Sequence, residues 1–202
     1  MKLYYAPGAC SLASHIVLQE TGKSFEIDKL NVPTKTTATG DDFMQINPKG
    51  YVPTLKLDDG SVLTEGAVIM QYIADQNPDS GLAPKQGTME RYRLQEWLNF
   101  VGTEIHKSYS PLFNKAMPEE AKSITRNLLT KRLSHVETQL ADKPYLMGTK
   151  FTVVDAYLFV VLRWSERVGI DLATFPRIQD YVARIASRPS VQTAMQAEGL
   201  IK

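Results

Sequence analysis

The chain has a single cysteine, Cys10, among its 202 residues. One cysteine excludes an internal disulfide and also excludes a zinc site built from several cysteines. Histidine is almost as scarce, and His15, His106 and His135 do not show the four-residue spacing of paired metal ligands on a helix. We therefore expect neither a metal nor another resident cofactor.

Long apolar runs and an excess of one charge are missing as well. The longest unbroken apolar run covers residues 156–162, which is far too short to span a bilayer. Residues 1–8 lack the apolar stretch of a secretory signal. The chain carries 23 Lys and Arg against 22 Asp and Glu, whereas a nucleic-acid-binding domain is normally basic. We expect a soluble cytoplasmic protein with no membrane or nucleic-acid partner.

Arginine is absent from the first part of the chain, and this absence separates two halves. Residues 1–80 carry 6 Lys and 10 acids, a net charge of −4, whereas residues 81–202 carry 17 basic and 12 acidic residues, a net charge of +5. Between the halves, residues 77–87 are rich in Pro, Gly and polar side chains, a composition typical of a linker. We predict two domains, residues 1–80 and residues 87–202.

The first domain alternates strands and helices. Apolar residues and turn signals predict a strand over residues 3–6, a helix over 11–21, a strand over 25–30 and a short helix over 41–46. A hairpin comes next over residues 54–57 and 61–63, joined by Asp58-Asp59-Gly60, and then a helix over residues 65–76. This order of elements is that of a thioredoxin-like α/β domain.

The second domain is predicted to be an all-helical bundle. A long helix has an apolar face made by Leu94, Trp97, Leu98, Val101 and Ile105. The next helix starts with Pro118 in its first turn, and its predicted core face is Ala121, Ile124, Leu128, Val136 and Leu140. Thr152 and Asp155 resemble a capping box ahead of the apolar residues 156–162. A further helix is marked by Ile178, Val182 and Ile185 and ends at Arg188-Pro189.

Cys10 is a candidate for thiol chemistry because it stands at the start of a predicted helix. Unpaired N–H groups and the helix dipole at that end stabilise a thiolate. The position three residues later is Ala13, so a dithiol cycle within the chain is impossible. A second sulfur must come from outside, and glutathione is the most abundant soluble thiol. The alternative is a buried structural cysteine.

Two further positions in the first domain suit a peptide ligand. A cis bond at Val52-Pro53 would leave the Val52 backbone able to pair with an extended peptide, and the alternative is an ordinary trans proline at a strand start. Glu65-Gly66 opens a helix, whose N–H groups suit a carboxylate while the Glu65 side chain suits an ammonium. The alternative for this pair is a plain acidic first turn.

The long helix of the second domain carries a polar stripe, formed by Asn99, Thr103, His106 and Ser110. His106 beside Lys107 would supply one donor that switches near neutral pH and one fixed cation. The alternative is a solvated face. His15 and His135 are interpreted as ordinary helix-surface or packing residues.

Together these residues resemble the glutathione transferases, and most closely the bacterial beta class. The matching stretches run along the whole chain: Met1-Lys2-Leu3-Tyr4-Tyr5, Pro7-Gly8-Ala9-Cys10-Ser11, Asn47-Pro48-Lys49-Gly50, Val52-Pro53, Leu63-Thr64-Glu65-Gly66, Glu96-Trp97-Leu98-Asn99, His106 and Phe151-Thr152-Val153-Val154-Asp155-Ala156-Tyr157. The resemblance implies a thioredoxin-like domain followed by a helical one, a homodimer, and glutathione bound between the domains.

The resemblance also implies roles for single residues. Cys10 would face the glutathione sulfur, Val52 would hold the cysteinyl backbone, and Lys35 would neutralise the glycyl carboxylate. Glu65 and Gly66 would hold the γ-glutamyl end, although many members of the family have Ser where this chain has Gly66. The residues expected to close the site from the helical domain, partly from the partner subunit, are Asn99, Thr103, Glu104, Ile105 and His106. By periodicity, Ile105 points towards the core.

The implied activity is detoxifying conjugation, in which the glutathione thiolate attacks a hydrophobic electrophile and forms a thioether. Cys10 and His106 are the expected contacts of the sulfur. Two alternatives stay open: a glutathione-dependent thiol-disulfide reductase or peroxidase that uses Cys10, and a non-catalytic carrier of apolar compounds. The sequence does not name the electrophile, nor does it say whether Cys10 hydrogen-bonds the glutathione sulfur or forms a mixed disulfide with it.

Overall fold

The chain folds into two units, which a computed structural model describes over residues 1–202. Unit 1 contains Met1–Ala83 and Ser187–Lys202, and unit 2 contains Pro84–Ala186. The sequence pattern assigned the last residues to the helical domain, whereas in the structure they pack with the first unit. None of the helices combines the length and the apolar character needed to cross a membrane.

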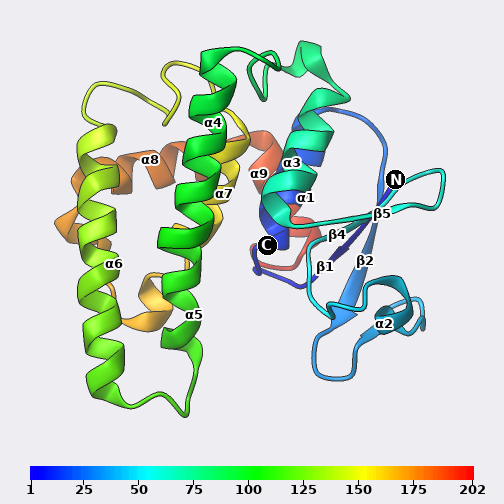
Figure 1. Ribbon diagram of the computed structural model, residues 1–202, viewed down its shortest axis with the longest axis horizontal. Helices are drawn as coiled ribbons and strands as arrows, with labels where there is room; N and C mark the ends of the chain where they lie inside the picture. The colour runs from blue at the N-terminus through cyan, green and yellow to red at the C-terminus, as the bar shows by residue number, and fades with distance from the viewer. The chain divides into compact units, whose positions relative to one another are not determined.

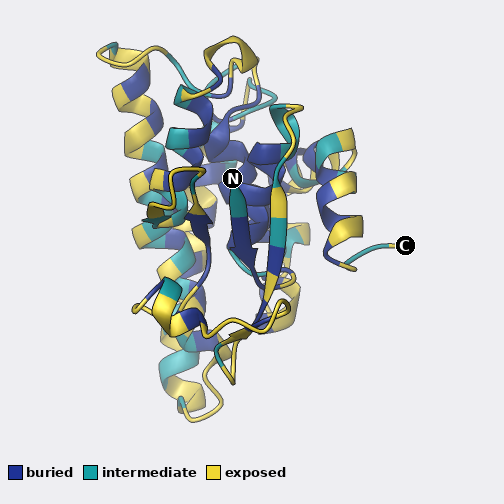
Figure 2. Cartoon of the chain, turned by 90° about the vertical axis from the view of Figure 1, so that its right-hand side faces the viewer, coloured by how far each residue is buried: buried dark blue, intermediate teal, exposed yellow.

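Unit 1 is built on a five-stranded mixed sheet with the order β3-β2-β1-β4-β5. Its strands are β1 (Lys2–Tyr5), β2 (Glu26–Asn31), β3 (Thr36–Thr37), β4 (Thr54–Lys56) and β5 (Val62–Thr64). β1 runs parallel to β2 and antiparallel to β4, as in a thioredoxin-like sheet. Figure 2 shows β1 buried along most of its length, while exposed and buried residues alternate along β2. The two-residue β3 has no period for a sequence pattern to detect.

Three helices of unit 1, α1 (Ser11–Glu20), α3 (Gly66–Asp75) and α9 (Pro189–Ala197), lie side by side on one face of the sheet (Figure 1). The short α2 (Phe43–Ile46) lies apart from them near the end of β2, and a 3₁₀ turn, η1 (Pro78–Ser80), comes after α3. Phe43 of α2 packs in a small core with Tyr4, Leu30 and Val52. Alternate residues of a strand face opposite sides of its sheet, so Tyr4 faces away from its neighbours Leu3 and Tyr5. Together with Phe43, it packs against Val52 and supports the chain there.

Buried and half-buried polar contacts attach the C-terminal segment to unit 1. Nε and Nη2 of Arg188 each donate to a carboxylate oxygen of Glu20 at 2.8 Å. Glu198, after α9, accepts the backbone N–H of Gly8 at 2.9 Å and lies 3.0 Å from Nδ1 of His15. His15 and Glu198 are both buried, so His15 is a packing residue as expected. These contacts join residues far apart in the sequence, and no local pattern reveals them.

Unit 2 is all-helical, with α4 (Met89–Phe100), a π-helical turn η2 (Val101–His106), α5 (Lys107–Phe113), α6 (Glu119–Gln139), α7 (Val153–Leu162), the 3₁₀ turns η3 (Glu166–Val168) and η4 (Leu172–Thr174), and α8 (Pro176–Ala186). Every residue of α7 is buried, in agreement with its apolar sequence. The capping box at Thr152 and Asp155 is confirmed, because each side chain bonds the backbone of the other. Burial raises the pKa of Asp155.

The predicted core face of α6 is partly wrong. Ile124 and Leu128 are 58% and 50% exposed, whereas Leu129 and Leu133 are fully buried. Leu128 and Leu129 are adjacent, so either one satisfies a helical period. The structure buries Leu129, in step with Leu133 and Val136 at spacings of four and three residues. Pro118 was predicted in the first turn but is the N-cap, so this helix begins one residue later than predicted, at Glu119.

Candidate functional site

Cys10 occupies the N-cap position of α1, and its thiol donates to the backbone carbonyl of Val52 at 3.5 Å. The loop before it is anchored by Ser11, whose hydroxyl accepts from the N–H of Ala6 at 3.1 Å and lies 3.3 Å from the carbonyl oxygen of Ala6. The thiol therefore stands at the positive end of α1, half-buried, against the residue that precedes Pro53.

The bond between Val52 and Pro53 is cis, as the sequence predicted. The side-chain amide of Asn47 donates to the carbonyl of Tyr51 and to the hydroxyl of Thr54, each at 2.9 Å. Asn47 is buried, so these two bonds fix the course of the backbone between them. We call residues 49–53 the 49–53 segment.

The 49–53 segment contacts each of the other predicted ligand residues of unit 1. Besides the Cys10 contact, the Lys35 ammonium donates to the carbonyl of Gly50 at 2.7 Å. Glu65 Oε1 accepts from Nζ of Lys49 at 2.7 Å and from the hydroxyl of Tyr51 at 2.8 Å. A segment of five residues thus brings Cys10, Lys35 and Glu65 together.

Gly66 completes this group by its closeness to the proline ring. A Cβ atom built on Gly66 would lie 3.3 Å from Cγ of Pro53, which is closer than ordinary van der Waals contact. A serine at this position would fit only if Pro53 moved by a few tenths of an ångström. The departure from the family pattern at Gly66 is therefore matched by the local packing.

Glu65 has an unusual backbone. Its φ of +70° lies in a region that residues other than glycine rarely adopt. Its carbonyl accepts from the N–H groups of Val68 and Ile69, both at 2.9 Å, which starts α3. No side chain caps this helix, so the positive end of its dipole can accept an anion. Such backbone strain is typical of functional positions.

His106 lies in unit 2, in the π-helical turn, a form that often marks functional positions. Its Nδ1 is 2.6 Å from the hydroxyl of Tyr157, and the edge of Trp164 packs on its ring with 5.0 Å between centroids. Burial, and after it the charge of Lys107, lowers the pKa of His106 to about 4. The expectation of a switch near neutral pH is therefore wrong: the imidazole is neutral at pH 7, because its surroundings remove the water that would stabilise its charge.

The remaining predicted residues of the helical domain divide into surface and core. Asn99 and Thr103 are exposed, and the Thr103 hydroxyl donates to the Asn99 carbonyl at 3.0 Å. Glu104 forms an ion pair with Arg132 at 2.7 Å. The Ile105 side chain is fully buried, as its periodicity indicated, so only its backbone could contact a ligand.

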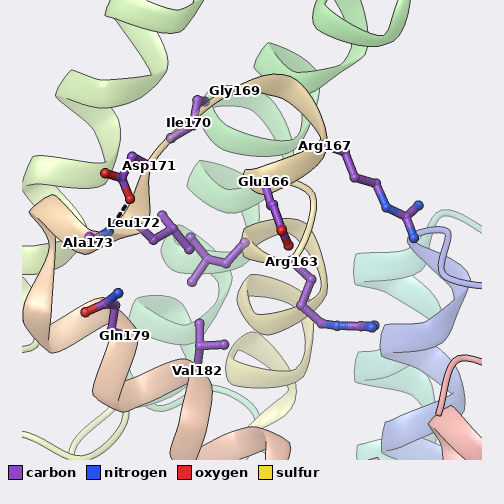
Figure 3. A pocket seen from close by; sticks show the side chains of 11 residues that line it. Arg163, Glu166, Arg167, Gly169, Ile170, Asp171, Leu172, Ala173, Gln179 and Val182 are labelled. Carbon is purple, nitrogen blue, oxygen red and sulfur yellow. Dashed lines mark hydrogen bonds between the residues drawn. The ribbon is translucent and has the colours of Figure 1, made fainter.

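A separate pocket of about 770 Å³ lies in unit 2, between the end of α7, the loop after it and the start of α8 (Figure 3). It contains none of the predicted site residues. Leu172 and Val182 are among its apolar lining residues, and four charged side chains also line it: Arg163, Glu166, Arg167 and Asp171. No group of three or more His, Cys, Asp or Glu side chains is arranged to hold a metal ion.

Sequence patterns missed the parts that Lys49, Tyr51 and Tyr157 play. Lys49 lies in the matching stretch Asn47-Pro48-Lys49-Gly50, and Tyr51 lies between that stretch and Val52-Pro53. A charged side chain close to the backbone predicted to pair with a peptide was the available signal. Nothing in the sequence pairs Tyr157 with His106, because 51 positions separate them.

Comparisons with known proteins agree with this geometry. The family model described as "Glutathione S-transferase, N-terminal domain" matches residues 8–76, and the corresponding C-terminal model matches residues 100–189. The chain is 48% identical over 200 residues to "Glutathione S-transferase GstA" of Escherichia coli O157:H7, covering 99% of this chain and 100% of that protein.

Solved structures give the same result. The structure described as a ternary complex of BphK, a bacterial GST, has a TM-score of 0.97 at 53% identity, covering 99% of this chain and 100% of that one. A bacterial beta class enzyme of Sphingomonas chungbukensis has a TM-score of 0.96 at 49% identity. A sphingomonad glutathione S-transferase complexed with glutathione has a TM-score of 0.96 at 47% identity. The last two comparisons each cover 100% of both chains.

Proposed function

The chain belongs to the glutathione S-transferase family, in its bacterial beta class, and on that premise we propose that the 49–53 segment is the part of unit 1 along which reduced glutathione binds. The enzyme is a glutathione transferase, and the proposed second substrates are hydrophobic electrophiles. A detoxifying role in the cytoplasm is part of the same proposal.

The observation that carries this proposal is the contact between the Cys10 thiol and the Val52 carbonyl, 3.5 Å long. A peptide that pairs with the Val52 backbone would bring its own cysteinyl sulfur beside Cys10 and the positive end of α1. Lys35, at one side of the segment, is the proposed partner of the glycyl carboxylate. Glu65 and the uncapped start of α3 are the proposed partners of the γ-glutamyl end.

The proposed chemistry is nucleophilic attack by the glutathione thiolate. The glutathione thiol gives its proton to solvent, its sulfur forms a bond to the electrophilic carbon, and the leaving group departs with the electron pair. The Cys10 S–H can turn from Val52 to the new thiolate and donate to it, which favours the anion. His106 is neutral and supplies one N–H. It remains a predicted contact of the sulfur, and Asn99, Thr103, Glu104 and the Ile105 backbone remain predicted contacts of the ligand.

The test is titration calorimetry with reduced glutathione, together with assays against a panel of electrophiles, peroxides and mixed disulfides. We expect saturable binding of glutathione and thioether formation with at least one electrophile. Binding of apolar compounds without turnover of any panel member would instead identify a carrier. Absence of glutathione binding would overturn the proposal.

Disulfide reduction is a second candidate activity, and it is favoured by the half-buried thiol of Cys10 at a helix N-terminus. In that reaction the Cys10 thiolate attacks the glutathione sulfur of a mixed disulfide and releases the other thiolate. A second glutathione thiolate then attacks the adduct, which yields oxidised glutathione and restores Cys10. A reducible adduct on Cys10 during turnover would support this activity.

A further inference from the structure

Lys49 lies at the γ-glutamyl end of the proposed glutathione site, so any role for it in ligand binding rests on the proposed function. We propose that Lys49 recognises the α-carboxylate of glutathione by exchanging partners. When glutathione binds, the ammonium of the ligand displaces the Lys49 ammonium from the Glu65 carboxylate. Lys49 then turns to the α-carboxylate of the ligand.

Lys49 and Glu65 form the ion pair that is to be exchanged. Lys49 Nζ donates to Glu65 Oε1 at 2.7 Å and to the Thr64 hydroxyl at 2.9 Å. The two charged side chains are 47% and 54% exposed, so a ligand can reach both. An exposed ion pair of this kind contributes little to stability, so opening it costs little.

The chemistry of the ligand fits this pair. The γ-glutamyl end of glutathione carries an ammonium and a carboxylate on one carbon, and the protein carries an ammonium and a carboxylate on neighbouring side chains. After the exchange, each charged side chain meets the ligand group of opposite sign: Glu65 meets the ammonium, and Lys49 meets the carboxylate. The start of α3, which no side chain caps, adds the positive end of its dipole to the charge that meets the carboxylate.

Tyr51 is suited to hold Glu65 during the exchange. Its hydroxyl donates to the same oxygen, Oε1, at 2.8 Å. When Lys49 departs, this bond keeps the carboxylate in place for the incoming ammonium. The hydrogen bond to Glu65 raises the pKa of both Lys49 and Tyr51, so both groups remain protonated donors at neutral pH.

The alternatives give different binding patterns. If Lys49 only competes with the ligand ammonium, its removal tightens binding. If it only positions Glu65, its removal weakens every ligand that carries the ammonium. If it contacts the α-carboxylate, its removal weakens only the ligands that have this carboxylate. Glutathione and 4-aminobutyryl-cysteinylglycine, which keeps the ammonium and lacks the α-carboxylate, separate the three cases.

The experiment measures the Kd of both peptides by calorimetry for the wild type, Lys49→Gln, Lys49→Arg and the matched control Lys29→Gln. Lys29 is exposed on β2, away from the 49–53 segment in sequence. We expect Lys49→Gln to weaken glutathione binding about fivefold to tenfold and to leave the aminobutyryl peptide unchanged or tighter. Lys49→Arg should stay within about threefold of the wild type, and Lys29→Gln should match the wild type for both peptides.

Equal weakening of both peptides, or tighter glutathione binding by Lys49→Gln, would overturn this role of Lys49 and leave the proposed function standing. A wild-type protein that binds neither peptide would overturn the proposed function itself. Thermal unfolding of each variant shows whether it is folded, and Lys49→Ala, which also removes the ammonium, takes the place of Lys49→Gln if that variant is not.

Discussion

The Cys10 thiol donates to a carbonyl 3.5 Å away, and a serine hydroxyl at the same position can also donate. Replacing Cys10 by serine therefore tests the two chemical roles of the residue separately. A donor to the glutathione sulfur can be oxygen or sulfur, whereas the nucleophile of disulfide reduction must be sulfur. Since Cys10 is the one cysteine of the chain, no other thiol can replace it.

We predict that Cys10→Ser keeps a measurable part of conjugation, loses disulfide reduction and no longer forms a glutathione adduct detectable by mass spectrometry. Cys10→Ala, which has no donor, should conjugate more slowly than Cys10→Ser, about tenfold if one hydrogen bond to a thiolate is lost. The measurement is kcat/KM with one electrophile and one mixed disulfide. If Cys10→Ser binds glutathione but does not conjugate at all, Cys10 is an obligatory nucleophile and the proposed mechanism is wrong.

His106 gives a second prediction, on stability and pH. Its pKa is about 4 in the folded chain and near 6.5 when exposed, so the unfolded state binds a proton first as the pH falls. The stabilisation from neutral His106 is complete above about pH 6.5 and is lost as the pH falls towards about 4, by up to about 3 kcal/mol. Asp155 opposes this trend, because its raised pKa favours the folded state in acid.

His106→Gln should therefore flatten the loss of stability between pH 6.5 and pH 4, measured by urea unfolding at several pH values. His135→Gln is the control, because the His135 side chain is exposed. The conjugation rate of the wild type should show no inflection from His106 between about pH 6 and 8. If the two variants have the same pH dependence of stability, His106 is not held neutral.

At the scale of single elements, α6 provides a matched pair of adjacent leucines. Leu129 is fully buried and Leu128 is 50% exposed. We predict that Leu129→Ala lowers the free energy of unfolding by about 2–5 kcal/mol, because it removes buried methyl groups and leaves a cavity. Leu128→Ala should change it by about 0.5 kcal/mol or less. Denaturant unfolding of the two variants measures both values, and equal losses would show that both leucines pack in solution.

The elements that the sequence predicted well are those determined by local chemistry. The capping box at Thr152, the turn at Asp58-Asp59-Gly60 and the uniformly apolar α7 each depend on neighbours within a few positions. The face of α6 was misassigned because Leu128 and Leu129 fit the period equally well, and only the packing partners distinguish them. The neutral state of His106 depends on burial by Tyr157 and Trp164, which is a property of the tertiary structure.

The candidate site shows the same division. Cys10, Val52 and Glu65 were predicted because each has a local signature: a helix start, an X-Pro bond and an acidic first turn. Lys49 and Tyr51 were missed because their importance comes from a contact with Glu65, at least 14 positions away. Side chains that act through a distant partner are the ones that sequence patterns leave out.

For the whole molecule, the charge difference between the units remains after the boundary is corrected. Arg188, Lys202 and Glu198 join unit 1 and change its net charge from −4 to −3, which leaves +4 on unit 2. Oppositely charged units suit a closed twofold dimer in which the unit 1 of one subunit faces the unit 2 of the other. The homodimer therefore remains a prediction.

Light scattering at micromolar concentration should give twice the 22.6 kDa of one chain. Because exposed charges are screened by salt, the dimer should dissociate more readily at about 1 M salt than at about 0.1 M. A monomeric mass with full conjugation activity would contradict this prediction.

The attachment of the last residues to unit 1 has a consequence for protein synthesis. A chain leaving the ribosome presents Gly8, His15 and Glu20 long before Arg188 and Glu198 have been translated. The loop that carries Cys10 therefore gains its buried carboxylate partner, Glu198, only after a further 190 residues have been translated beyond Gly8. Domains of nascent chains commonly fold in order from the N-terminus, but here all residues of unit 2 are translated before the last residues of unit 1. We therefore expect unit 2 to complete its fold before unit 1.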